Sequence, residues 1–140
     1  MSLELPDVNV LFALAFVEHE HHARAENWWV NSTRYATTPI TESGLVRMAL
    51  NPRVSGQPLT WADAAAVLES VRNRSGAEFL EDDATLVQPR VDPKLIRGHR
   101  QVTDFHLLGL AVRHDAVLVT FDRGIEEAFG KQHGDSIRVL

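Results

Sequence analysis

The sequence predicts an α/β fold: a three-layer α/β/α sandwich with a mostly parallel central sheet of about five strands. Short runs of β-forming residues alternate along the chain with longer segments whose apolar residues recur at helical spacing. Residues 116–120 read Ala-Val-Leu-Val-Thr, an apolar run typical of a strand buried on both faces. Because connections between parallel strands are almost always right-handed, helices should cover both faces of the sheet.

The first half of the chain contains both element types, separated by clear turn signals. In the first helix, Val8, Leu11 and Leu14 share one face. Pro39 stops the second strand, and the two prolines and one glycine of the following loop end the third helix. Thr60 is a good N-cap for the next helix. The expected elements are a strand at 3–6, helices at 7–17 and 21–30, a strand at 35–38, a helix opening at 41–43 and running to 50, a loop at 51–59, a helix at 61–74 and a strand at 77–80.

The second half contains the clearest amphipathic helix, in which Phe105, Leu108 and Ala111 fall on one apolar face. The segment before this helix shows no regular periodicity, so we expect it to be mostly irregular. The expected elements are an irregular segment at 81–100 with one helical turn at 93–96, a helix at 101–114, a strand at 116–120, a short helix at 124–129 and a strand at 136–140.

Length and composition narrow the class of protein. A chain of 140 residues fits a single domain over 1–140. The 14 Lys and Arg against 19 Asp and Glu give a net charge of −5, so no basic tract can hold a nucleic acid by charge alone. The absence of cysteine excludes disulfides and thiolate metal sites and is consistent with a cytoplasmic protein. The apolar run 8–17 lacks a basic flank and is too short to span a bilayer, so we expect neither a signal peptide nor a membrane anchor.

Four acidic residues stand where strands give way to helices. Asp7 and Asp122 follow the two most apolar strands, and Glu42 and Asp104 lie in the first turns of helices. Ligands of parallel sheets bind outside the carboxyl ends of the strands, so these four side chains should face one crevice. Converging carboxylates repel one another unless a cation compensates them. The pattern therefore predicts a site for a hard divalent cation.

Four motifs carry a resemblance to a known family: DVNVLFAL, TESGLVRM, GHRQVTDFHLLGLA and VLVTFDRG, in this order along nearly the whole chain. Together they resemble a PIN domain and, within that superfamily, the VapC toxins of toxin–antitoxin modules. The resemblance implies an endoribonuclease that depends on Mg²⁺ or Mn²⁺, forms a homodimer and is silenced by a VapB antitoxin. By position, the acidic quartet of the family corresponds to Asp7, Glu42, Asp104 and Asp122, with Asn9 and Thr120 as polar supports.

The expected chemistry is hydrolysis of RNA phosphodiester bonds. Magnesium keeps several of its waters and takes one or two carboxylates directly. We therefore expect Asp7 and Asp104 to be the main direct ligands, with Glu42 and Asp122 acting partly through water. Thr120 would donate to a carboxylate. Asn9 would fix the Asp7 side chain.

Each candidate residue also has a purely structural interpretation. Asp7 and Asp104 could be helix N-caps, Glu42 could complement a helix dipole and Asp122 could begin a turn. For a single residue the cap is the more frequent role. The expected placement of all four acidic residues on one edge of the sheet favours a metal site.

Histidines, tryptophans and arginines give weaker signals. The cluster of His19, His21 and His22 could bind a transition metal, but neighbouring helical residues point to different faces. The tryptophans at 28, 29 and 61 could stack on bases, but more often such residues fill a core or a dimer interface. Three basic residues could contact phosphate or belong to a solvated loop: Arg97, His99 and Arg100.

Two other functions compete with the ribonuclease. A phosphatase on a similar sheet would use an aspartate after the first strand and usually a second one two residues later, where this chain has Asn9. A catalytically silent PIN-like module would bind RNA or a protein without cleavage. An incomplete acidic quartet would favour the silent module, and here the quartet is complete. The RNA target stays open, because the segment 81–100 matches no pattern.

Overall fold

The computed structural model describes residues 2–140, and these residues form a five-stranded sheet in which every strand runs parallel to its neighbours. The predicted sandwich is confirmed, with a sheet that is entirely rather than mostly parallel. In spatial order the strands are β3 (Ala77–Phe79), β2 (Tyr35–Thr37), β1 (Glu4–Pro6), β4 (Val117–Thr120) and β5 (Ile137–Val139).

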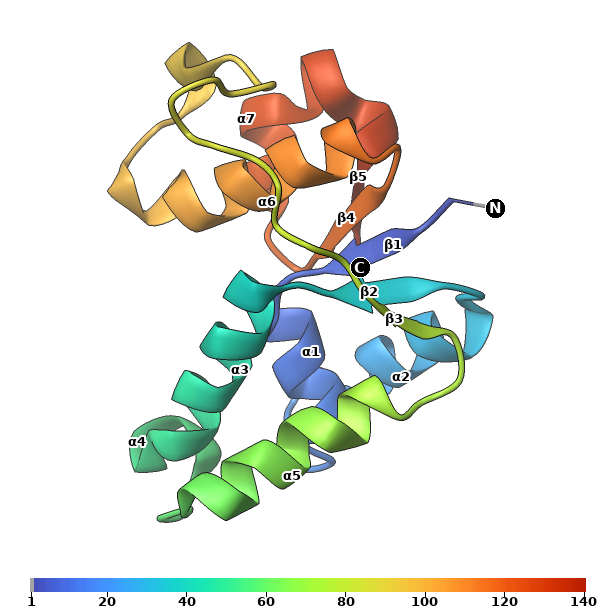
Figure 1. Cartoon of the computed structure of the whole chain (residues 1–140), viewed down its shortest axis with the longest axis vertical. Coiled ribbons are helices and arrows are strands. Elements are labelled where there is room, and N and C mark those ends of the chain that lie inside the picture. The colour runs from blue at the N-terminus through green and yellow to red at the C-terminus, as the bar shows by residue number, and fades with distance from the viewer. Residues whose placement is uncertain (1) are drawn as a thin grey trace.

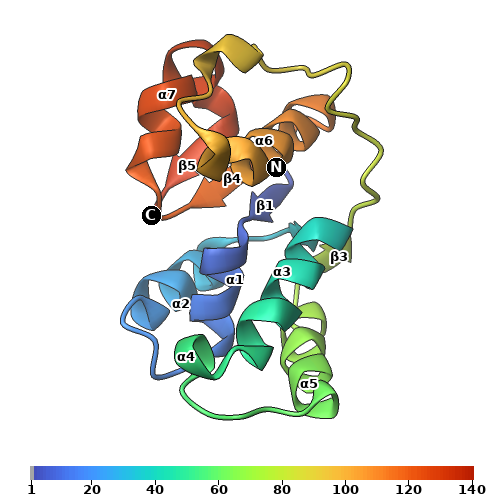
Figure 2. The same ribbon diagram turned by 90° about the vertical axis from the view of Figure 1, so that its left-hand side faces the viewer.

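Helices cover both faces of this sheet (Figures 1 and 2). One side carries α1 (Val8–Ala15), α2 (His22–Asn31), α3 (Pro39–Leu50), α4 (Pro52–Ser55) and α5 (Trp61–Arg72). The other side carries α6 (Val102–Arg113) and α7 (Arg123–His133). Short 3₁₀ turns lie at η1 (Pro93–Leu95), η2 (His99–Gln101) and η3 (Gly134–Ser136). Within residues 2–140, no helix is both long and apolar enough to cross a bilayer.

The sheet separates two apolar cores. One contains Leu107, Leu110 and Phe129 from α6 and α7, and the other contains Leu11 and Trp28 from α1 and α2. Both cores include residues of the central strands, as expected for strands buried on two faces. The chain order reverses between β1 and β4, because β2 lies on one side of β1 and β4 on the other. Such a switch point leaves a crevice outside the carboxyl ends of the two strands.

Several elements differ from the sequence-based expectation: α1 ends at Ala15 rather than at residue 17, and α3 begins at Pro39 rather than at 41–43. Two larger differences have clear physical reasons. The predicted loop 51–59 contains the helix α4, because the Asn51 side chain accepts the Arg53 N–H and Pro52 occupies the first helical position. The last helix extends to His133 rather than ending at Phe129. Gly130 inside it costs only about 1 kcal/mol of helix propensity. The buried face of Ile125, Ala128 and Phe129 outweighs that cost.

Helices α1 and α3 lie side by side (Figure 1). They approach each other closely at Gly44. A Cβ atom at Gly44 would lie 2.6 Å from Cγ2 of Val8, closer than real Cβ contacts. Val8 is β-branched and therefore has few alternative rotamers. The glycine thus permits the approach of the helix that follows β1 to the helix that carries Glu42.

Candidate metal centre at the carboxyl edge of the sheet

Asp7 is buried where β1 meets α1, with 3% of its surface exposed. Its Oδ1 accepts the backbone N–H of Val10 at 2.9 Å, which makes it the N-cap of α1, and its Oδ2 accepts the Thr120 hydroxyl at 2.6 Å. Burial raises the pKa of this carboxyl, and the two hydrogen bonds offset part of that rise. A hydrogen bond from the Asn9 backbone amide also lowers the Asp7 pKa, whereas Asn9 as a whole is exposed.

Thr120, the last residue of β4, joins two of the acidic residues. While its hydroxyl donates to Asp7, the same oxygen accepts the backbone N–H of Asp122 at 3.0 Å. Asp122 in turn caps α7, because its Oδ1 accepts the Gly124 N–H at 2.8 Å. The cap interpretation of Asp7 is therefore confirmed, and Asp122, expected to begin a turn, is the N-cap of α7. Both caps lie at the switch point of the sheet.

Asp104 lies in the first turn of α6 but is not its N-cap. Burial, followed by the negative charges of Asp7 and Asp122, raises the pKa of its carboxyl to about 7. The charges of Asp7 and Asp122 thus act on Asp104, which is consistent with the placement of all three at the carboxyl edge of the sheet. In residues 2–140, no Lys, Arg or His forms an ion pair with any of the three. The structure thus gathers negative charge that no side chain compensates.

Glu42 lies in the first turn of α3, on the β2 side of the same edge. Its Oε2 accepts the Thr37 hydroxyl at 2.6 Å and lies 3.6 Å from Nη1 of Arg72. Glu42 does not contribute to the pKa shifts of Asp7 and Asp104. The sequence pattern had brought all four acids together, whereas the structure couples the three aspartates and attaches Glu42 to different partners.

The donor set at this edge fits a hard cation. The atoms that could bind a metal here are carboxylate and hydroxyl oxygens, which suit Mg²⁺ or Mn²⁺ and not a soft metal. Within the described part of the chain, no three acidic or histidine side chains are already close enough to share one ion. Ligation by three carboxylates would therefore require their oxygens to move closer together.

The remaining predicted residues lie in different surroundings. Arg97 faces α7, where its Nη2 donates to the Glu127 carbonyl at 3.3 Å, while His99 and Arg100 are exposed in the turn before α6. In the histidine cluster, His22 Nδ1 donates to the Ala13 carbonyl at 2.8 Å. Nor does the cluster form a metal-binding group within residues 2–140.

The tryptophans also differ from one another. Trp28 is buried, and its Nε1 donates to Glu4 at 3.0 Å, so it is a core residue as predicted. Trp29 is partly buried under the Arg74 guanidinium. Trp61, in contrast, is 69% exposed and lines a groove of about 740 Å³ that reaches Glu42.

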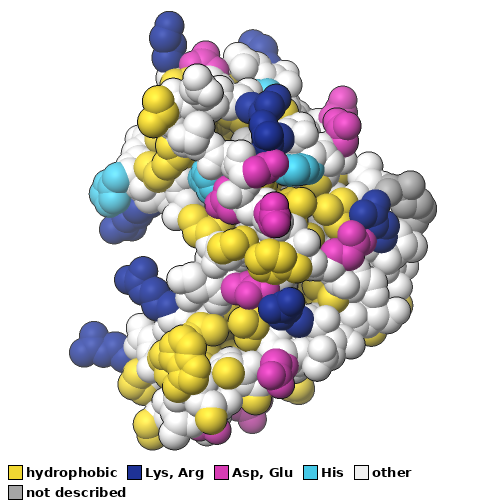
Figure 3. Space-filling view, viewed as in Figure 1, with side chains coloured by type: hydrophobic (Ala, Val, Ile, Leu, Met, Phe, Trp, Pro, Cys, Tyr) yellow, Lys and Arg dark blue, Asp and Glu magenta, His cyan; other side chains and the backbone are white. Residues whose placement is uncertain are grey.

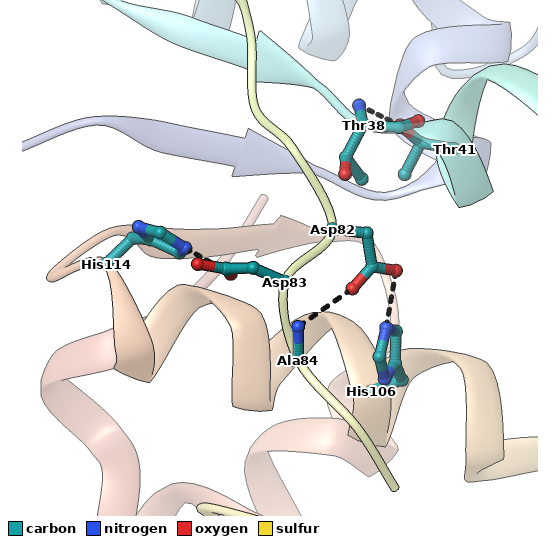
Figure 4. A network of polar contacts seen from close by, with 7 residues as sticks. All are labelled: Thr38, Thr41, Asp82, Asp83, Ala84, His106 and His114. Atoms are coloured by element: carbon teal, nitrogen blue, oxygen red, sulfur yellow. Dashed lines mark hydrogen bonds and ion pairs between the residues drawn. The ribbon is translucent and has the colours of Figure 1, made fainter.

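Sequence reasoning missed a set of contacts that ties the segment after β3 to α6 (Figure 4). His106 Nε2 donates to Asp82 at 2.6 Å, and His114 Nε2 donates to Asp83 at 2.7 Å. Arg113 also pairs with Asp83 at 3.0 Å, and these partners lower the pKa of Asp83 to about 2. No pattern in the sequence links Asp82 and Asp83 to residues some 24 to 31 positions later, so only the structure shows these contacts.

Comparison with known proteins identifies the family of this chain. Residues 5–130 match the PIN domain family. The chain is 49% identical to Ribonuclease VapC38 of Mycobacterium tuberculosis (strain ATCC 25618 / H37Rv) over 125 residues, which cover 88% of this chain and 87% of that protein. It is 42% identical over 127 residues to Ribonuclease VapC39 of the CDC 1551 / Oshkosh strain, covering 89% and 91%, and 40% identical over 127 residues to its Ribonuclease VapC29, covering 90% of each. The chain therefore belongs to the PIN-domain family and, within it, to the VapC proteins.

Proposed function

We propose that this protein is a Mg²⁺-dependent endoribonuclease that hydrolyses RNA phosphodiester bonds, with Mn²⁺ as an alternative cofactor. The observation that carries the proposal is the group of three coupled aspartates, Asp7, Asp104 and Asp122, at the switch point of the sheet without a compensating cation. The names of the relatives, each a ribonuclease, support RNA as the substrate.

Asp7 and Asp104 would hold the cation directly, with Glu42 and Asp122 contributing partly through water. When bound, the cation would supply an activated water nucleophile and neutralise charge on the phosphate. Thr120 positions the Asp7 carboxylate and the backbone of Asp122 at the same time. The pKa of Asp104, raised to about 7 by burial and by the charges of Asp7 and Asp122, means that this carboxyl keeps its proton to a higher pH than an ordinary aspartate. Cation binding and proton release should therefore be linked.

A second candidate is the catalytically silent module, which one specific observation favours. Within the described residues, the acidic side chains do not yet form a three-ligand group. The two functions differ in one measurement, because only the enzyme shortens RNA.

The test is incubation of total RNA with the protein in Mg²⁺ and in EDTA, read on a denaturing gel. We expect cleavage in Mg²⁺ only, and its loss in Asp7→Asn. Asp135→Asn is the matched control, because Asp135 is exposed in η3, before the amino end of β5. RNA that stays intact in Mg²⁺, or equal cleavage by Asp7→Asn, would contradict the proposal.

Control by a VapB-type antitoxin and assembly as a homodimer belong to the same proposal. An antitoxin arginine placed among the four acids would occupy the position of the cation and pair with the carboxylates. Of the tryptophans invoked for a dimer, Trp28 is buried in the monomer, so an exposed interface would rest on Trp61. Inhibition that weakens as Mg²⁺ rises, and that disappears when the antitoxin arginine becomes alanine, would support this mode of control. Inhibition indifferent to both would exclude it.

A further inference from the structure

One exposed aromatic residue lies on the same edge of the sheet as the acidic residues. Phe79 ends β3, the strand next to β2, and 47% of its surface is exposed. Two strand spacings separate β3 from β1, which corresponds to roughly 10 Å. Since the strands are parallel, Phe79 lies at their carboxyl edge, beside the residues that we assign to the cation.

The side chain of Arg72 lies against this aromatic ring. The Arg72 guanidinium lies 5.4 Å from the centroid of Phe79, and its Nη1 lies 3.6 Å from Glu42 Oε2. That separation exceeds a normal hydrogen-bond length, so the guanidinium keeps free N–H donors. Among residues 2–140, Arg72 is the only Lys or Arg that pairs with any of the four acids.

An acidic protein needs local contacts to hold RNA, and Phe79 and Arg72 can supply them. A net charge of −5 and an acidic edge repel an RNA phosphate, so any RNA must be held by local contacts. Figure 3 shows Lys and Arg side chains projecting on both sides of a notch in the surface. Exposed aromatic rings bind single-stranded RNA by stacking on bases, and arginine binds phosphate with several donors.

We infer that Phe79 and Arg72 form a nucleotide-binding subsite for single-stranded RNA beside the cation site. A base stacks on the free side of the Phe79 ring, and the Arg72 guanidinium donates to a phosphate next to that base. Exchange of Glu42 for phosphate costs little, because a partly exposed ion pair contributes little stability. The inference rests on the proposed function, since it adds a binding contact to the same RNA substrate.

Binding can be measured apart from cleavage. The probe is a fluorescein-labelled RNA of twelve adenosines in EDTA buffer, with fluorescence anisotropy as the readout and a gel to show that the RNA stays intact. We expect Phe79→Ala to weaken binding about fivefold or more, the factor that corresponds to the loss of about 1 kcal/mol of stacking. Arg72→Gln should also weaken binding and reduce its dependence on salt.

Two further variants separate stacking from packing. Phe79→Trp should bind at least as tightly as the wild type, whereas Phe79→Leu, which stays apolar, should bind as weakly as Phe79→Ala. The control is Arg34→Gln, because Arg34 is an exposed arginine just before the amino end of β2, whereas Phe79 lies at the carboxyl end of β3; its partner is Glu78 of β3. Equal binding by all variants, or equal loss in Arg34→Gln and Arg72→Gln, would overturn the subsite.

Cleavage assays distinguish failure of the subsite from failure of the proposed function. If the wild type cleaves RNA, Phe79→Ala should raise KM with little change in kcat, because Phe79 lies away from the reacting atoms. If the wild type binds the probe but cleaves no RNA, the proposed activity fails and the subsite stands. If Phe79→Ala changes the oligomeric state on size exclusion and leaves RNA binding unchanged, the ring belongs to a protein interface instead.

Discussion

Asp104 lies in the first turn of α6 and Asp83 pairs with residues at the end of the same helix, yet their environments shift their pKa values in opposite directions. Burial and two neighbouring aspartates raise the pKa of Asp104 to about 7. His114 and Arg113 lower the pKa of Asp83 to about 2. The fold therefore compensates the carboxylates that fasten the segment after β3 and leaves those at the carboxyl edge uncompensated. Perturbed carboxyls of the second kind are typical of functional sites.

The largest expected difference between the two aspartates is in activity. Asp104→Asn should lower Mg²⁺-dependent RNA cleavage by at least about a hundredfold, more than most losses of outer-shell partners. Asp83→Asn should stay within about twofold of the wild type, because Asp83 fastens a segment outside the site. Initial cleavage rates of both purified variants, with circular dichroism as a check of folding, make the measurement. Similar losses in the two variants would erase the distinction.

The pH dependence of stability should also separate them. Because the pKa of Asp104 is higher in the folded protein than the ordinary 3.8, folding favours its protonated form. The metal-free protein should therefore lose stability as the pH rises from about 4 to about 7. The upper bound for this change is about 4 kcal/mol, at 1.36 kcal/mol for each pH unit. Urea unfolding in EDTA at several pH values measures it, and Asp104→Asn should flatten the curve over this range. An unchanged slope in Asp104→Asn would assign the effect to other groups.

Magnesium should reverse that loss. A ligand that binds only the folded state at 100 times its Kd stabilises it by about 2.7 kcal/mol. We expect Mg²⁺ to raise the Tm of the wild type and of Asp83→Asn, but not that of Asp104→Asn. Differential scanning calorimetry at saturating Mg²⁺, with Na⁺ at equal ionic strength as the control, tests this expectation. A rise of equal size in all three proteins would indicate binding elsewhere.

The smallest expected effect concerns Asp83 itself. Its lowered pKa means that it stabilises the folded protein above pH 4, and that this stabilisation is lost as the pH falls toward 2. Because Asp83 is exposed, water and salt screen the effect, and Asp83→Asn should show only a slightly shallower acid limb in thermal unfolding. A large change would mean that this contact holds the segment 81–92 more strongly than a surface pair does.

Much of the fold could be predicted from the sequence because its signals are local. The apolar run that became β4 and the periodic face of α6 each identify one element without reference to the rest of the chain. The same holds for Asp7 and Asp122, which mark the ends of strands and therefore the edge of the sheet. The helix α4 was missed, because prolines that end one helix can also begin the next.

The partners of the site residues could not be predicted in the same way. Arg72 follows from no local pattern near Glu42, because 30 positions of chain separate two side chains that meet only after α5 has packed on the sheet. The different surroundings of Glu42 and the three aspartates likewise arise from tertiary packing. Sequence position indicates which edge a residue occupies, and packing decides which charges it meets there.

The close contact between Gly44 and Val8 links the position of Glu42 to that of Asp7. Val8 follows Asp7 directly, and Gly44 lies two residues beyond Glu42, so the missing side chain at Gly44 limits how far the two carboxylates can stand apart. One added methyl group would act as a wedge between the helices that carry them. The distance between the two carboxylates thus depends on the absence of a side chain at Gly44. A substitution there would change the geometry of the site without altering any of its charged residues.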